Sequence, residues 1–172
     1  MGGEEAGKLF VNLARQEENE AERSNHYARA AFCYAKALNR ELLEKKFTQK
    51  TEELAWEVIL LGERSEELCG DVVHPSSQLY FFMSRAYAVL TYVECLRSRG
   101  AVAAQGEKRE EERARLFMNR ARGYLHLAEL PASSKAGAGR SGRTRAYSSH
   151  FSKLLSKYAV QLDTLEERLL GG

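Results

Sequence analysis

The stretch from Tyr27 to Leu38, Tyr-Ala-Arg-Ala-Ala-Phe-Cys-Tyr-Ala-Lys-Ala-Leu, constrains the fold more than any other part of the chain. On an α-helix its apolar side chains cover most of the circumference and leave mainly Arg29 and Lys36 for water. A helix that is apolar on so many sides does not rest on a single neighbour. We therefore expect a central helix between two others, with alanines that allow close approach.

The composition agrees with a soluble, helix-rich protein. Of the 172 residues, 44% are hydrophobic, 29% are charged and only two are proline. We expect no membrane span and no secretory leader, because no apolar run approaches the roughly 20 residues that a span needs. The isolated residues Cys33, Cys69 and Cys95 are expected to be reduced thiols, as in a cytosolic protein.

Five further helices are predicted around the central one, from apolar periodicity and from capping and helix-ending residues. They are expected over residues 8–23, 40–68, 76–97, 108–130 and 146–169, with Ser24-Asn25 capping the central helix and Asn39 near its end. We expect the N-terminal residues to be loosely structured, because they include Gly2, Gly3 and Gly7. Residues 101–106 are expected to form a turn and residues 132–144 a flexible loop. The last helix carries a heptad pattern of Phe151, Leu155, Tyr158, Leu162, Leu165 and Leu169. The fold class is all-α, with about six antiparallel helices.

The second half of the helix at 40–68 is apolar nearly all round, because Trp56, Ile59 and Leu60 point to different sides. Two interpretations stay open: this half joins two subdomains, or Trp56 and Leu60 form an exposed patch that binds a partner. The joining role is favoured, since most large apolar side chains belong to a core.

No motif for catalysis is found. The chain has no phosphate-binding glycine loop, no nucleophile elbow and no Cys or His spacing typical of a metal site, and its carboxylates fall on predicted exposed faces. We expect no enzyme activity and neither cofactor nor metal. The basic residues Lys135, Arg140, Arg143 and Arg145 lack interleaved aromatics, so no nucleic-acid partner is expected.

The order of three later segments carries a resemblance to a known family. They are Gln78-Leu-Tyr-Phe-Phe-Met-Ser-Arg-Ala-Tyr-Ala, Arg113-Ala-Arg-Leu-Phe-Met-Asn-Arg-Ala and Arg145-Ala-Tyr-Ser-Ser-His-Phe-Ser-Lys, and they follow Tyr27-x2-Ala30-x3-Tyr34-x2-Ala37-Leu38 and Glu44-Lys-Lys-Phe-Thr. Together they resemble the N-terminal tandem MIT domains of Vta/LIP-type activators of the ESCRT-disassembling AAA ATPase. The resemblance implies two three-helix units, at residues 1–70 and 71–172. The central helix alone also resembles a tetratricopeptide repeat, although no 34-residue period covers the chain.

The resemblance further implies a non-enzymatic adaptor in endosomal sorting, cytoplasmic and peripheral to endosomal membranes, with only indirect membrane association. Its partners would be amphipathic C-terminal helices of ESCRT-III-type proteins, bound by helix-in-groove recognition. An AAA ATPase would be contacted through a region outside this chain. The peptide-binding residues on the matching helix would be Lys46, Phe47, Lys50, Glu53, Leu54 and Glu57. The alternatives are an ordinary solvated flank at these positions, and a tetratricopeptide-like or other helical scaffold that assembles a larger complex.

Overall fold

The computed structural model describes residues 2–44, 47–69, 76–100, 104–130 and 141–171, and within these ranges the protein is all-α, as predicted. The side chains of residues 99–100, 104–110 and 141–149 are outside the description. The helices are α1 (Gly3–Gln16), α2 (Glu20–Leu43), α3 (Gln49–Cys69), α4 (Ser77–Gly100), α5 (Ala104–Glu129) and α7 (Ser141–Leu170).

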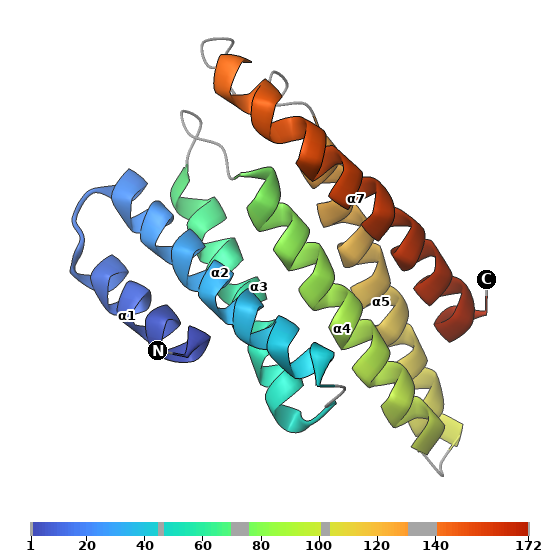
Figure 1. Ribbon diagram of the computed structural model, residues 1–172. Coiled ribbons are helices and arrows are strands. Elements are labelled where there is room, and N and C mark those ends of the chain that lie inside the picture. Colours follow the sequence, from blue (N-terminus) through green and yellow to red (C-terminus); the bar gives the residue numbers. More distant parts are fainter. Residues whose placement is uncertain (1, 45–46, 70–75, 101–103, 131–140, 172) are drawn as a thin grey trace.

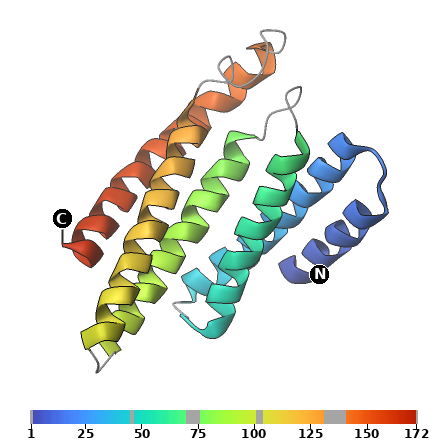
Figure 2. The ribbon, with the colours of Figure 1, turned by 180° about the vertical axis from the view of Figure 1, so that it is seen from behind.

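The helices form an array in which consecutive helices pack side by side in antiparallel fashion. Helices α2, α4 and α7 lie on one face, and α3 and α5 lie behind them (Figures 1 and 2). Helix α1 is at one edge and α7 at the other. One connected hydrophobic core includes side chains from all six helices of the described residues. The division into units at residue 70 remains a prediction.

Helix α2 lies between α1 and α3, as its wide apolar surface predicted. Its side chains Ala30, Ala31 and Ala35 are buried and allow both neighbours to approach closely. The expected loose start at Gly3 and Gly7 is wrong, because both glycines belong to α1 and face α2. A Cβ atom on Gly7 would lie 2.6 Å from the ring of Tyr34, so the helix can pack here only without a side chain.

The predicted boundary between the first two helices is also wrong. Helix α1 ends at Gln16, and the side chain of Asn19 caps α2 by accepting a hydrogen bond from the Glu22 backbone N–H at 3.1 Å. Ser24 lies inside α2 and bonds across to α3 instead. Its hydroxyl donates to the Ser65 carbonyl oxygen, and the Ser65 hydroxyl donates to the Ser24 carbonyl oxygen, both at 2.8 Å.

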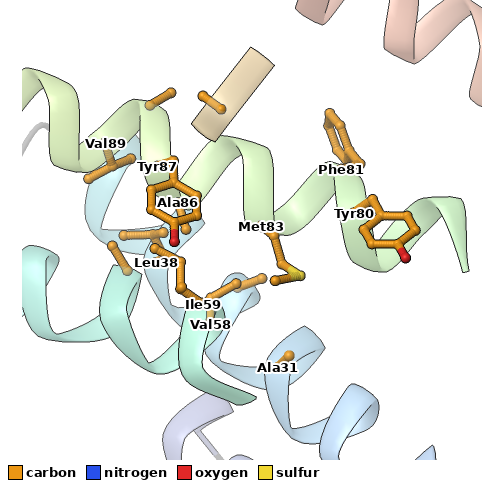
Figure 3. Close-up of a cluster of buried hydrophobic side chains, with 14 of the residues drawn as sticks. Ala31, Leu38, Val58, Ile59, Tyr80, Phe81, Met83, Ala86, Tyr87 and Val89 are labelled. Atoms are coloured by element: carbon orange, nitrogen blue, oxygen red, sulfur yellow. The ribbon is translucent and has the colours of Figure 1, made fainter. Parts of the chain in front are cut away.

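The next two boundaries differ in detail. Helix α2 continues to Leu43, and α3 begins only at Gln49, where Thr48 accepts a hydrogen bond from the Thr51 N–H. Helix α4 begins close to the predicted residue 76 and is capped by Ser76, whose hydroxyl accepts a hydrogen bond from the Leu79 N–H at 3.1 Å. Met83 of α4 points toward Val58 and Ile59 of α3, which closes the centre of the core (Figure 3).

Helices α5 and α7 complete the array. Helix α5 begins at Ala104 and α7 at Ser141, so the helices take in part of the turn and of the loop that were predicted at residues 101–106 and 132–144. The rest of the loop lies outside the described residues, with Lys135 and Arg140. The predicted heptad is confirmed from Phe151 to Leu165, because Leu155, Tyr158 and Leu162 are buried and Phe151 and Leu165 pack against the core. At its last position Leu170 packs against the core in place of the predicted Leu169.

Candidate functional site

A groove of about 370 Å³ runs between α1 and α3, with Tyr27 of α2 in its lining. Figure 2 shows α1 and α3 on either side of α2. Val11 and Arg15 line the groove from α1, while Leu60, Arg64 and Glu67 line it from α3. Leu60 is 56% exposed, so its side chain offers accessible apolar surface in the lining. The groove therefore offers apolar surface with charged groups beside it.

The second half of one exposed face of α3 lines this groove. Lys50, Glu53, Glu57, Leu60, Arg64 and Glu67 recur at intervals of three and four residues, which places them on the same side of the helix. The exposed Lys50 ammonium lies 2.6 Å from the Glu4 carboxylate of α1, so an ion pair crosses between the two helices near the start of α3. At the other end, the Arg64 guanidinium lies 5.8 Å from the centre of the Tyr27 ring.

Carboxylates of α1 and α3 lie near Tyr34 of α2, next to the groove. The pKa of Tyr34 is raised, first by burial and then by the nearby carboxylates of Glu57 and Glu4. Positive charge comes from Lys50, Arg15 and Arg64. Because both signs of charge flank an apolar strip, the groove suits an amphipathic helix that itself carries charges of both signs.

The six residues predicted to bind a peptide do not form one surface in the structure. Lys50, Glu53 and Glu57 share the exposed face of α3 that leads into the groove. Leu54 is 2% exposed and belongs to the core. Phe47 is 44% exposed and its ring lies 4.6 Å from that of Tyr92 on α4, away from α1. Lys46 lies outside the described residues.

Sequence reasoning missed the part of the groove lining that α1 contributes, namely Val11 and Arg15, and the lining by Tyr27. It also missed the ion pair between Glu4 and Lys50. The first helix had been expected to begin at Lys8, which left Glu4 out of any element. The signal that could have corrected this is Asn19, a good N-cap residue followed by Glu20 and Glu22 in the first turn of a helix.

Trp56 lies on the other side of α3, where its ring meets Phe117 of α5 edge-on, at a centroid distance of 5.7 Å. This contact links α3 to α5, and the role of joining two subdomains stays a prediction. Leu60 is exposed in the lining of the groove. Trp56 and Leu60 therefore do not face the same side of α3.

Two clusters of charged side chains link neighbouring helices, and one of them is centred on a buried carboxylate. Glu94 of α4 is 2% exposed and pairs with Arg97 at 2.9 Å and with Arg113 of α5 at 3.5 Å, while Arg97 also pairs with Glu52 of α3. Arg122 of α5 similarly pairs with Asp163 and Glu166 of α7, both at 2.8 Å. Among the described residues there is no cluster of three side chains that would hold a metal ion, and no helix is long and apolar enough to cross a membrane.

Comparisons of the chain with protein-family models, with curated proteins and with solved structures find no match. The structure thus establishes an all-helical protein with a groove between α1 and α3, and the family resemblance stays a prediction.

Proposed function

We propose that this chain is a non-enzymatic adaptor that binds amphipathic C-terminal helices of ESCRT-III-type proteins in endosomal sorting, in the groove between α1 and α3. The observation that carries the proposal is the exposed Leu60 set between charged side chains of α3, opposite Val11 and Arg15 of α1. Helix-in-groove recognition uses this combination, because apolar anchors enter the cleft and flanking charges fix the register.

The roles of the lining residues follow from their positions. Leu60 and Val11 would contact the apolar face of the bound helix. Lys50, Glu53 and Glu57 would select charges at one end of it, and Arg64 and Glu67 at the other. In the cell the protein would be cytoplasmic and would reach endosomal membranes only through its partners. Contact with an AAA ATPase would require a region outside this chain.

The test is a titration of fluorescently labelled ESCRT-III C-terminal peptides, with binding followed by fluorescence anisotropy. Leu60→Asp should weaken the binding about tenfold or more, since losing an apolar anchor at the centre of an interface costs more than 1 kcal/mol. Val160→Asp is the matched control, because Val160 is also an exposed apolar residue but lies on α7 at the other edge of the array. A complete absence of saturable binding by the unmodified chain would refute the proposal.

The second candidate is a tetratricopeptide-like or other helical scaffold that assembles a larger complex. Its support is the packing of consecutive antiparallel helices into one array with a shared core. A scaffold of this kind binds its partners over an extended surface of the array rather than in one groove. The same titration separates the two candidates, because only the adaptor predicts that binding of a free ESCRT-III peptide is lost in Leu60→Asp.

A further inference from the structure

Helices α2, α4 and α7 form one layer of the array and run in the same direction, in front of α3 and α5 (Figure 1). Their contacts fix how each helix is turned about its axis. Helix α2 meets α3 through Ser24 and α4 through Phe32. Helix α7 meets α5 through Asp163 and α4 through Tyr158. The helix positions away from these contacts form the outer side of the layer and face solvent.

This outer side carries basic side chains from all three helices. The exposed ones recur at intervals of seven, four and eleven residues, which keeps those of each helix on one side. None of them forms an ion pair with another described residue. We call this surface the basic face; its members are Arg29, Lys36 and Arg40 of α2, Arg85 of α4, and Lys157 and Arg168 of α7.

The carboxylates of α4 and α7 point away from the basic face. Glu94, the only acidic residue of α4, is buried and pairs with α5. In α7, Asp163 and Glu166 both pair with Arg122 of α5. The remaining one, Glu167, lies seven residues after Val160 and therefore at the edge of the array. These two helices thus add positive charge to the face and no negative charge.

Helix α2 adds a single carboxylate to the face. Glu20 lies seven residues before the buried Tyr27, so it is on the side of the core. Glu41 lies seven residues after the buried Tyr34 and is on the same side. Glu22 shares the outer side with Arg29, but it is in the first turn, at the end of the face. In the layer behind, α3 has six glutamates and only two basic residues, so the charges are divided between the two layers.

Arg85 lies at the centre of the face and is the basic residue with the least solvent around it. Its guanidinium lies 5.6 Å from the centre of the Phe81 ring, and burial lowers its pKa. A guanidinium in such a place is costly unless a negative charge comes near it. In the described part of the chain no carboxylate pairs with it, so the missing anion must come from another molecule.

Exposed leucines lie among these charges and indicate the kind of anion. They are Leu43 of α2, seven residues after Lys36, Leu96 of α4, eleven residues after Arg85, and Leu154 of α7, three residues before Lys157. Leucine enters the boundary between lipid headgroups and acyl chains, whereas single-stranded nucleic acids are held by aromatic stacking. The charges also extend over about 16 Å along α2 and along α7, which is too far for one small anion.

We propose that the basic face binds the surface of a bilayer that contains anionic lipids. The six basic side chains would contact the headgroups, and the three leucines would enter between them. The groove between α1 and α3 is seen from the other side of the molecule (Figure 2), so it would stay open to a peptide. This direct contact goes beyond the association through partners given above, and it does not depend on the proposed function.

The probe is a vesicle of phosphatidylcholine and phosphatidylserine, with phosphatidylcholine vesicles as reference, and sedimentation with the vesicles measures binding. We expect binding to the anionic vesicles only, and its loss at high salt. Lys36→Glu/Lys157→Glu should weaken it about 25-fold or more, since each basic residue near an anionic bilayer contributes about fivefold. Lys8→Glu/Arg120→Glu is the matched control. It changes the net charge equally, but Lys8 shares a side of α1 with Glu4, and Arg120 is on α5.

The leucines give the second arm. Leu43→Ser/Leu154→Ser should weaken vesicle binding about tenfold at unchanged charge. Far-UV circular dichroism checks that each variant is folded. The proposal is overturned if anionic vesicles bind no better than neutral ones, or if the two charge variants lose binding equally. It is also overturned if the chain prefers single-stranded RNA to vesicles. Leu60→Asp should leave vesicle binding unchanged, so failure of the proposed function is seen separately, in the peptide titration.

Discussion

Helices α1 and α7 lie at opposite edges of the array and are held there by opposite means (Figure 1). Helix α1 packs on α2 through glycine and alanine, so that the two backbones come close and few large side chains are buried between them. Helix α7 packs on α4 and α5 through aromatic rings, a leucine heptad and the ion pairs of Arg122. The packing of α1 therefore depends on residues with small side chains, and that of α7 depends on large side chains and ion pairs.

The difference bears on function. The groove between α1 and α3 is open because α1 approaches α2 so closely and contributes only Val11 and Arg15 to the lining. At the α7 edge large side chains meet instead, as Phe81 does with Phe151 and Tyr158. An edge helix seated by small residues thus leaves room for a ligand helix beside it.

The largest effect is expected at the aromatic edge, from Phe81→Ala. The Phe81 ring meets Tyr158 at 5.2 Å and Phe151 at 6.0 Å, both edge-on, and it is buried. Removing it should cost about 3–5 kcal/mol of unfolding free energy, because the rings of α7 cannot collapse into the cavity. Urea denaturation followed by circular dichroism measures this cost. Phe47→Ala, at a half-exposed ring, serves as control and should cost much less; equal costs would contradict the role of Phe81.

A second test at the same edge uses pH. Burial raises the pKa of Tyr158 to about 12, above its usual value of 10. The neutral phenol is therefore favoured in the folded state, and its contribution is complete below about pH 10 and is lost as the pH rises through about 12. At about 1.4 kcal/mol per pKa unit, the loss is about 3 kcal/mol.

The variant Tyr158→Phe isolates this contribution from that of the other buried tyrosines. Below pH 10 it should be less stable than the unmodified chain, because the hydrogen bond between Tyr158 and Ser84 at 2.8 Å is lost. Above pH 10 the difference should shrink steadily, and denaturation curves at a series of pH values would show it. Parallel pH profiles for the two proteins would mean that Tyr158 is not buried in solution.

At the α1 edge the informative variant adds a methyl group to Gly7. Gly7→Ala places a Cβ atom 2.6 Å from the Tyr34 ring, so α1 must shift away from α2. We expect a loss of about 1–3 kcal/mol, although alanine favours the helix itself by about 1 kcal/mol. Denaturant unfolding measures the loss, and binding of ESCRT-III peptides should weaken with it because the wall of the groove moves. A variant as stable as the unmodified chain would show that α1 does not pack closely.

The two edges also explain how much of the structure could be predicted from the sequence. The heptad of α7 consists of large apolar residues at fixed intervals, and it was predicted correctly from Phe151 to Leu165. Gly3 and Gly7 were misinterpreted because glycine is a weak helix former, and only the surface of α2 shows why it is needed. The same limit applies to the candidate site. Lys50, Glu53 and Glu57 follow from helical periodicity, whereas Val11, Arg15 and Tyr27 come together only through the packing of α1 on α2.

The smallest expected effect has the opposite sign and comes from Gly123→Ala in α5. The substitution is chemically the same as Gly7→Ala, and both glycines lie inside helices, but a Cβ atom on Gly123 meets nothing within 4 Å. The gain in helix propensity is therefore not opposed by a clash, and stability should rise by about 1 kcal/mol. Thermal and urea denaturation of the two variants side by side would measure the loss of stability in Gly7→Ala and the gain in Gly123→Ala. If Gly123→Ala destabilised the chain, the space above α5 would be filled in solution by this chain itself.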